Sequence, residues 1–452
     1  MTNDQIPDDW MADHQLVLVG ANPLPCYVVA KLLLRPGRTL HLVHTPEMKD
    51  AVERIGESFP GWQRSEIDNP ANPAVIKAAV QHALDQCVTG AVVGLNYTGG
   101  TKSMAVHAHH TAVSWQESTR REVIRTYLDA GTLSLYRDDH ATPIYVQRKV
   151  DMKIDCLLKL HGIGLDPQRP AEREPRHADL CRTLAGAHQS EAGQNAYDRW
   201  CQRYLRRSKQ TDRELVEGIL SKAGLVQARL ASVPDTDIAI TKVADDLRGS
   251  TACRSELVEK KTQFPYNPIP FPTDGELAAV ASSLREIFKI AGDSFDPVAV
   301  ANDPGLGFRG IADLVKFLDG DWVEHWVLQC FNEVKAKTGI GDIATTLKTT
   351  KDPYDFEFDV AALQGYQLYA VSCTRSSDRH LCKSKLFEAV VRATQLGGDE
   401  AKVALVCCDR NAQQLQKQVV EAWRAKREHV RVFGPCELPV LTSHFESWLN
   451  IR

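Results

Sequence analysis

Short apolar runs alternate with amphipathic stretches over the first 150 residues of the chain. The apolar runs are LVLVG at 16–20, LHLVH at 40–44 and GAVVGLN at 90–96. The amphipathic stretches predict helices at about 25–34, 47–58, 72–87 and from about 101 onward. This alternation predicts a parallel sheet with helices on both faces, closed by the strand-like runs VIRTYLD, LSLYR and PIYVQ.

The pattern changes after this region. Residues 151–304 are more polar and mostly helical, and the proline-rich run FPYNPIPFP interrupts them at 264–272. We interpret them as a helical connector with room for a small winged-helix-like unit. A basic stretch in this connector suits either a solvated helix face or contact with nucleic acid; it contains Arg199, Arg203, Arg206, Arg207, Lys209 and Arg213.

Residues 305–452 again mix helices and strands. The predicted order is a helix around Trp322, strands near 342–349, 355–363 and 366–374, a helix at 380–396, strand VALVCC, a helix at 411–426 and strand VRVFG. The sequence therefore predicts an α/β protein with a Rossmann-like domain at 1–150, a helical connector at 151–304 and a second α/β domain at 305–452.

Composition excludes several classes of protein. The 452 residues are 43% hydrophobic and 25% charged, which excludes wholesale disorder and fibrous architectures. The net charge of −4 means that any contact with nucleic acid must use local basic surface. The acidic start of the chain, the lack of a long apolar run and twelve cysteines without a CxxC pair predict a cytoplasmic protein with reduced thiols.

One turn in the first domain has the composition of an anion-binding site. The sequence NYTGGTKSM at 96–104 directly follows an apolar strand and opens a helix. Its two glycines allow close backbone approach, and the helix start presents free N–H groups. It is not a Walker A loop, because Thr101 separates Gly100 from Lys102.

Two other junctions should lie at the same edge of the sheet. GANPLP at 20–25 and Thr45 each follow a predicted strand, and ligands of open α/β sheets bind along the carboxyl edge of the strands. The alternative is a plain turn without a ligand.

Together, NYTGGTKSM, GANPLP and LVHTPEM resemble the CARF domain of CRISPR-associated proteins, the receptors for cyclic oligoadenylates made during type III interference. The resemblance implies a homodimer that binds the ring nucleotide, with cyclic tetra-adenylate as the activator, in a groove on the two-fold axis. It implies contacts to phosphate and ribose from Asn96, Thr98, Gly99, Gly100, Thr101 and Lys102. Asn22, Pro23 and Thr45 would shape the adenine pocket.

A predicted hairpin in the third domain carries two acidic residues. The run DFEFDVAALQGYQLYAVSCTRS reads as two strands joined at Gln364 and Gly365, a register that pairs Asp359 with Ala370 and Glu357 with Ser372. Alternation would then place Glu357, Asp359, Ser372 and Thr374 on one face. Two acids on one sheet face need either solvent or a cation, and a divalent metal satisfies this need and can activate water for phosphodiester cleavage.

This layout resembles the PD-(D/E)xK nuclease domain of CARF–nuclease fusions of the Card/Can type. The family has an acidic residue on a leading helix, an Asp on one strand and Glu-x-Lys on the next. Glu324 fits the helix position and Asp359 the first strand position, but Ser372, Cys373 and Thr374 stand where Glu-x-Lys is expected.

Two replacements for the missing Glu-x-Lys are possible. Glu357 would supply the missing oxygen ligand, with the carbonyl of Cys373 as a further ligand. Lys383 would supply the lysine, because its helical stripe also carries Leu386, Phe387 and Val390. Lys385 is the second choice, since its spacing to Glu388 and Arg392 indicates an exposed face.

The resemblance implies a cyclic-oligoadenylate-activated, metal-dependent nuclease of type III CRISPR antiviral defence that uses Mg2+ or Mn2+ and cleaves RNA, DNA or both. The alternative is a catalytically inactive ligand sensor, or a transcriptional regulator that contacts DNA through the basic helices of the connector.

Overall fold

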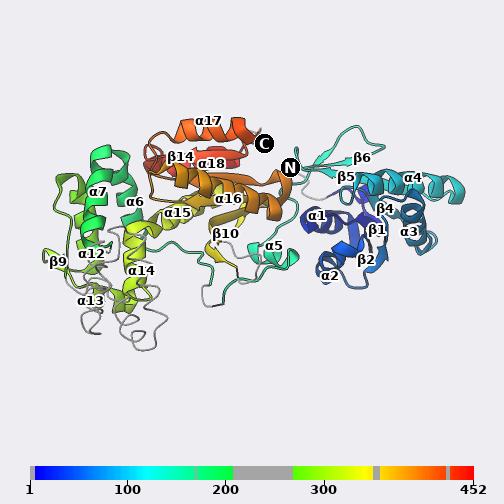
Figure 1. Cartoon of the computed structure of the whole chain (residues 1–452). Helices are drawn as coiled ribbons and strands as arrows, with labels where there is room; N and C mark the ends of the chain where they lie inside the picture. Colours follow the sequence, from blue (N-terminus) through cyan, green and yellow to red (C-terminus); the bar gives the residue numbers. More distant parts are fainter. Residues whose placement is uncertain (1–5, 168–169, 207–267, 350–356, 424–427, 452) are drawn as a thin grey trace, which may run out of the picture. The chain divides into compact units, whose positions relative to one another are not determined.

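The chain folds into two compact units. The computed structural model describes residues 6–167, 170–206, 268–349, 357–423 and 428–451, with only the backbone for Glu357 and Trp423 (Figure 1). The first unit comprises residues 1–174, 327–433 and 440–452, and the second comprises residues 175–326 and 434–439.

The first unit contains a seven-stranded sheet in the order β3-β2-β1-β4-β5-β6-β7. Its first five strands in this order are parallel, whereas β6 and β7 are antiparallel additions. The strands are β1 (Ala12–Leu18), β2 (Leu34–His44), β3 (Gln63–Glu66), β4 (Val93–Asn96), β5 (Val123–Asp129), β6 (Ser134–Arg137) and β7 (Ile144–Tyr145). The prediction of a parallel sheet with closing strands is confirmed. The polar strand β3 has no apolar pattern and was not predicted.

Helices cover both faces of this sheet because strand side chains alternate between the faces. Val17 of β1 packs in the same core as Leu24 and Val28 of α1, whereas Leu16 packs with Ile76 of α3. The helices are α1 (Pro23–Leu33), α2 (Lys49–Gly56), α3 (Pro73–Asp85) and α4 (Lys102–Thr119).

A second, five-stranded sheet in the same unit has the order β10-β11-β12-β13-β14. Its strands are β10 (Ile340–Lys348), β11 (Glu357–Gln364), β12 (Gln367–Cys373), β13 (Lys402–Val406) and β14 (Val430–Phe433). The first three form an antiparallel meander, and β12, β13 and β14 are parallel. The associated helices are α15 (Trp322–Thr338), α16 (Arg379–Gly397), α17 (Ala412–Trp423) and α18 (Leu441–Leu449). The predicted order of helix, meander, helix and strand is confirmed.

The hairpin register differs from the sequence prediction by two residues. Gln364 pairs with Gln367, so Gly365 and Tyr366 form the turn and Ala361 faces Ala370. Gly365 has a φ of 61°, and a Cβ at this position would collide with the carbonyl oxygen of Gln147. Only glycine therefore fits where the turn lies against the chain segment that follows β7.

A buried network of side-chain amides holds this turn. Gln147 Nε2 donates to Gln364 Oε1 at 2.7 Å and to Gln367 Oε1 at 2.5 Å, and the Tyr369 hydroxyl donates to both oxygens. Because unpaired buried amides are costly, the network favours this register over a shifted one.

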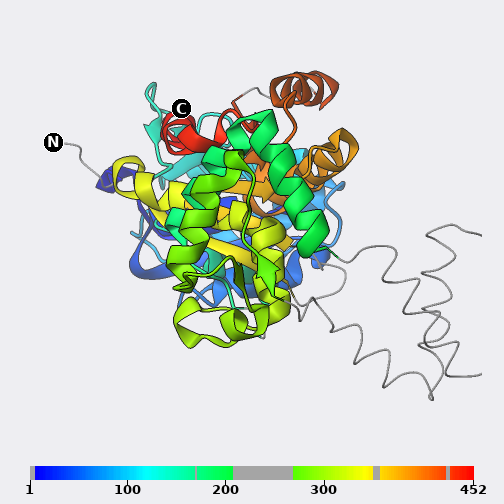
Figure 2. The same ribbon diagram turned by 90° about the vertical axis from the view of Figure 1, so that its left-hand side faces the viewer.

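The second unit is mainly helical (Figure 2). It contains α6 (Ala178–Gln189), α7 (Glu191–Tyr204), α12 (Ala278–Phe288), α13 (Pro297–Asn302) and α14 (Ile311–Lys316). Part of the predicted basic stretch takes part in ion pairs here: Arg199 with Asp274 at 2.9 Å and Arg206 with Asp319 at 2.9 Å. Arg207, Lys209 and Arg213 lie outside the described residues. Among the helices that are described, none has the length and apolar character of a membrane span.

Glu400 is a buried acid next to α16. It is 2% exposed, and its Oε1 atom has no hydrogen-bond partner in the described part of the chain. Burial raises the pKa of this carboxyl from 4.5 to about 7. The folded protein therefore holds a proton that the unfolded chain releases between these pH values.

We predict that Glu400→Gln changes the pH dependence of stability. The contribution of Glu400 to the free energy of unfolding should be most favourable below about pH 4.5. It should fall as the pH rises from 4.5 to 7, because the unfolded chain then releases a proton that the folded protein keeps. The variant should lack this loss and gain about 3 kcal/mol relative to wild type at pH 8. Urea unfolding from pH 5 to 8 measures the effect, with the exposed neighbour Asp399→Asn as control. Parallel profiles for wild type and Glu400→Gln would contradict it.

Candidate functional sites

The first candidate site is the carboxyl edge of the seven-stranded sheet. The strand β1 lies between β2 and β4, and the chain leaves β1 through α1 towards β2. The loops that follow β1 and β4 therefore meet at a topological switch point, where open α/β sheets bind ligands.

Glycines allow these two loops to touch. A Cβ on Gly99 would collide with the Leu18 carbonyl oxygen, and one on Gly20 would lie 2.9 Å from the Gly100 nitrogen. Gly100 also has a φ of 77°. The close approach of two backbones explains the Gly-Gly pair at this turn.

Several polar residues of this turn build the loop itself. Asn96 is fully buried; its Nδ2 atom donates to Thr126, and its Oδ1 atom accepts from the backbone of Thr98. The Thr98 hydroxyl accepts from the Leu128 backbone at 2.7 Å. The prediction that Asn96 contacts a ligand directly disagrees with its burial, and we assign it a role in shaping the turn.

The surface of the turn is formed by Gly100, Thr101 and Lys102, all exposed. The Thr101 hydroxyl caps α4 by accepting from the Met104 backbone, so the other free N–H groups of the first turn face the edge. Across the switch point, Asn22 caps α1 and Pro23 is buried at its first position. Thr45 is 8% exposed at the end of β2. The predicted ligand residues thus gather at one edge, with two helix N-termini.

The second candidate site surrounds Asp359 on β11. One carboxylate oxygen, Oδ2, accepts from the Ser372 hydroxyl at 2.9 Å and from the Cys373 backbone nitrogen at 2.5 Å. The Lys385 ammonium lies 3.6 Å from the same oxygen. The Asp359 side chain is 12% exposed, and its Oδ1 atom makes no hydrogen bond to any residue that the structure describes. Two hydrogen bonds and one ion pair therefore fix this carboxylate and leave one oxygen for a ligand.

The structure places Lys385, and not Lys383, next to Asp359. Lys383 is exposed, and Phe387, expected to pack on the sheet, is 54% exposed. The buried stripe of α16 instead runs through Cys382, Leu386, Ala389 and Ala393. Lys385 lies on this stripe, three residues after Cys382 and four before Ala389, so it points towards β11.

The remaining predicted residues lie in different places. Thr374 follows β12 and caps the next loop by accepting from the Ser376 backbone. Glu324 is half-buried in the first turn of α15, in the second unit. Glu357 opens β11, but its side chain lies outside the described residues. The Cys373 nitrogen is an Asp359 donor that sequence reasoning missed, because a backbone N–H leaves no signal in the sequence.

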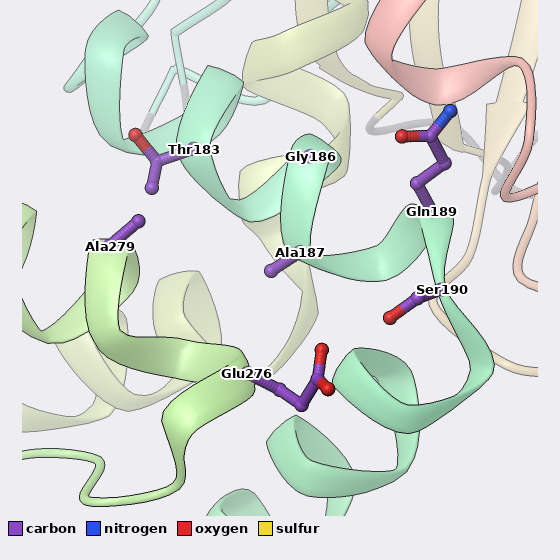
Figure 3. Close-up of a pocket in the computed structure, with 7 residues that line it drawn as sticks. All are labelled: Thr183, Gly186, Ala187, Gln189, Ser190, Glu276 and Ala279. Atoms are coloured by element: carbon purple, nitrogen blue, oxygen red, sulfur yellow. The ribbon is translucent and has the colours of Figure 1, made fainter.

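The second unit contains a pocket of about 610 Å3 between α6, α7 and α12 (Figure 3). Its lining residues are Thr183, Gly186, Ala187, Gln189, Ser190, Glu276 and Ala279. This lining is small and polar, with an acid and no base, so it does not suit a phosphate-bearing ligand.

Comparison with known proteins identifies the C-terminal part. Residues 312–451 match the family model described as Card1-like, endonuclease domain. The match includes the whole five-stranded sheet with the Asp359 site, so this part of the chain is similar to Card1-like endonuclease domains. Among curated proteins, none matches the chain.

Two solved structures share the fold of nearly the whole chain. Protein VC1899 from Vibrio cholerae is 16% identical and has a TM-score of 0.60, with 96% of this chain and 97% of that chain covered. Can2 from Sulfobacillus thermosulfidooxidans, in complex with cyclic tetra-adenylate, is also 16% identical and has a TM-score of 0.58, with 98% and 99% covered. The order of the two α/β parts is therefore common to all three chains.

We predict energetic coupling between Lys385 and Asp359. In a double-mutant cycle, Lys385→Met and Asp359→Asn should show a coupling of about 0.5–1 kcal/mol, because the ion pair is only partly exposed. The cycle of Lys383→Met with Asp359→Asn is the matched control and should show none within error. Urea unfolding of the single and double variants measures both values. Equal coupling in the two cycles would contradict the assignment.

Proposed function

We propose that this chain is a cyclic-oligoadenylate-activated nuclease of type III CRISPR antiviral defence, in which the Asp359 site cleaves phosphodiester bonds. The observation that carries the proposal is the Asp359 carboxylate held by Ser372, Cys373 and Lys385 within the part that matches Card1-like endonucleases. A carboxylate and a lysine on adjacent elements are the groups that PD-(D/E)xK chemistry requires.

The residues around Asp359 suit a hard divalent ion. Mg2+ and Mn2+ prefer carboxylate and carbonyl oxygens, and Asp359 Oδ1 is such an oxygen at a partly exposed position. We propose that Asp359 holds the ion, with Glu324, Glu357 and the carbonyl of Cys373 as further candidate ligands. When bound, the ion would supply a water nucleophile of lowered pKa and charge for the phosphate.

The chain's own residues would prepare the phosphate for attack. Ser372 and the Cys373 N–H direct Oδ2 of Asp359 inward and leave Oδ1 available. Lys385 keeps 35% of its side chain exposed, so its ammonium can contact a phosphate oxygen while it stays close to Asp359. It would offset the charge that develops on the phosphate during attack. Lys385 thereby replaces the lysine of the Glu-x-Lys pattern, and Ser372 takes the position of its acid.

The activator site is proposed at the carboxyl edge of the seven-stranded sheet. Its exposed turn at Gly100–Lys102 and the start of α4 present N–H groups and a positive charge to phosphate. The shared fold with Can2, which was solved with cyclic tetra-adenylate, supports this ligand. A ring of repeated nucleotides suits a two-fold site, so we propose a homodimer that binds one ring.

We predict that cleavage depends on Asp359 and Lys385. With cyclic tetra-adenylate and Mn2+, Asp359→Asn should lower the rate on labelled RNA or DNA by roughly 100-fold or more, and Lys385→Met by roughly 10-fold to 100-fold. Lys383→Met, the matched control on the exposed face of α16, should stay within about twofold of wild type. Assays of single-stranded RNA, single-stranded DNA and plasmid, with and without chelator, measure the rates.

The same assay tests the alternative function. If wild type leaves every substrate intact with every ring size and metal but still binds a ring, the chain is an inactive sensor or a transcriptional regulator. Equal loss in Lys383→Met and Lys385→Met would contradict the assignment of the lysine.

We predict that Gly99→Ala weakens binding of the activator in a protein that still folds. The added Cβ would displace the turn from the Leu18 carbonyl and weaken binding of cyclic tetra-adenylate by at least about tenfold. Gly90→Ala is the control, since a Cβ there meets nothing within 4 Å although its φ is 85°. Calorimetry measures the affinity, and thermal unfolding shows whether each variant is folded. Undiminished affinity in a folded Gly99→Ala protein would exclude this turn as the activator site.

A further inference from the structure

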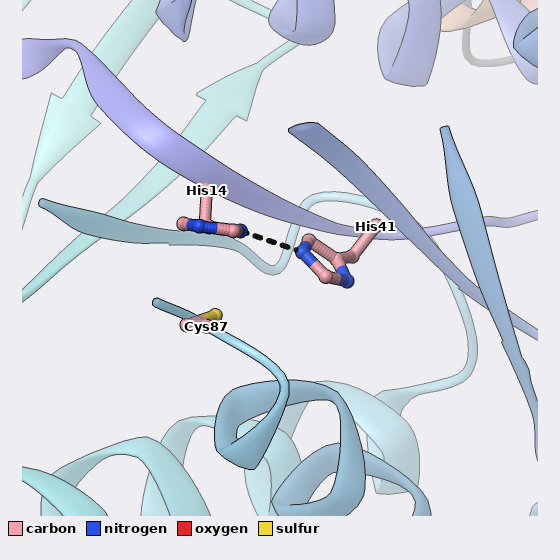
Figure 4. A group of neighbouring side chains, drawn as sticks. All are labelled: His14, His41 and Cys87. Atoms are coloured by element: carbon pink, nitrogen blue, oxygen red, sulfur yellow. Dashed lines mark hydrogen bonds between the residues drawn. The ribbon is translucent and has the colours of Figure 1, made fainter. Parts of the chain in front are cut away.

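Three metal-binding side chains meet inside the seven-stranded sheet, away from both sites described above. His14 comes from β1, His41 from β2 and Cys87 from the segment after α3 (Figure 4). One potential ligand atom from each lies within 4.8 Å of the other two, and all three residues are buried. The set of two imidazoles and one thiol has no role in the proposed nuclease.

The hydrogen bonds define the protonation of the two rings. The Val88 backbone N–H donates to His14 Nε2 at 3.2 Å, so the proton of a neutral His14 ring is on Nδ1. His14 Nδ1 then donates to His41 Nε2 at 3.0 Å. The proton of His41 must therefore be on its Nδ1, which is buried without a hydrogen-bond partner among the described residues.

Burial of these polar groups destabilises the fold compared with an apolar core. An orphaned N–H and two polar rings are enclosed where leucine or valine would pack without penalty. The hydrogen bonds are those of two neutral rings, because each ring has one nitrogen that accepts. Neutral imidazole is the form that binds a metal.

We propose that His14, His41 and Cys87 bind a zinc ion. Zinc prefers imidazole nitrogen and thiolate sulfur, and ligand atoms around a tetrahedral zinc lie roughly 3.3–3.7 Å apart. The 3.0 Å separation of the two ring nitrogens is close to this range, and the other separations, all within 4.8 Å, need to shrink by at most about 1 Å. A water molecule would complete the four ligands.

Binding changes the positions of two protons. The thiol of Cys87, whose pKa burial raises to about 12, must lose its proton, as zinc-bound cysteines do. The ion takes the place of the proton between the two rings. That proton moves to His14 Nε2, so the 3.2 Å contact with the Val88 N–H must open.

The position of the cluster indicates a structural role. His14 precedes Gly20 by six residues, so along an extended strand the cluster lies roughly 20 Å from the proposed activator edge. A bound ion would tie the segment after α3 to β1 and β2, which already pair as neighbouring strands. Loss of the ion should therefore lower stability without removing nuclease activity directly.

The experiment uses the full chain stripped with a chelator and then titrated with Co2+ or Zn2+ alone. A Co2+ thiolate gives a charge-transfer band in the near ultraviolet that oxygen ligands of the nuclease site cannot give. We expect this band in wild type and in Cys26→Ala, a buried cysteine of the same domain outside the cluster, and its loss in Cys87→Ala. Zn2+ should raise the melting temperature of wild type and Cys26→Ala by several degrees, but not that of Cys87→Ala.

Two further measurements keep the test independent of variant folding. Elemental analysis of unstripped wild-type protein should give about one zinc per chain, and amide exchange at Val88 should speed up when Zn2+ binds. The proposal is wrong if folded wild type shows neither stoichiometric zinc nor a thiolate band, or if Cys87→Ala retains both.

Discussion

The turn at Gly365 determines how β11, the strand of Asp359, pairs with β12. Because its backbone lies against the Gln147 carbonyl, the turn has room for only one register of β11 against β12. That register carries Asp359 to Ser372 and Cys373, which hold its carboxylate. The same turn joins the end of the first sheet to the second through buried glutamine amides. One glycine thus connects the packing of two sheets with the placement of a single acid.

The two candidate sites share one feature. Hydrogen bonds within the protein fix part of the polar groups of each site, and the remaining polar groups stay available to a ligand. At the first site, the side chains of Asn96 and Thr98 form hydrogen bonds within the loop, and the exposed surface consists of Gly100, Thr101 and Lys102. At the second site, two hydrogen bonds and the Lys385 ion pair hold Oδ2 of Asp359, and Oδ1 stays available to a ligand. Such fixed groups need little rearrangement when a ligand arrives.

The sequence predicted the layers of the fold because apolar alternation and helical periods are local signals. It also predicted the turn with Gly99 at the carboxyl edge of the first sheet and the strand that carries Asp359. A pair of glycines directly after a strand and an acid within an apolar hairpin are both unusual. It failed for β3, whose short polar strand is held by its neighbour β2 and not by its own pattern. It placed the buried face of α16 one residue out of phase, so that Lys385, and not Lys383, lies next to Asp359.

The helix α16 lies near Asp359 in its first half and near Asn22 just after its last residue. Near its start, Lys385 pairs with Asp359, and just after its end a Cβ on Gly398 would lie 2.9 Å from Asn22 Nδ2, at the edge proposed for the activator. The helix has 19 residues and is roughly 28 Å long. A helix of this length resists bending, so it acts as a stiff rod between the two places. A small tilt imposed beside Asn22 would therefore displace Lys385, which lies 13 residues and about 20 Å before Gly398, without any change in the strands between them.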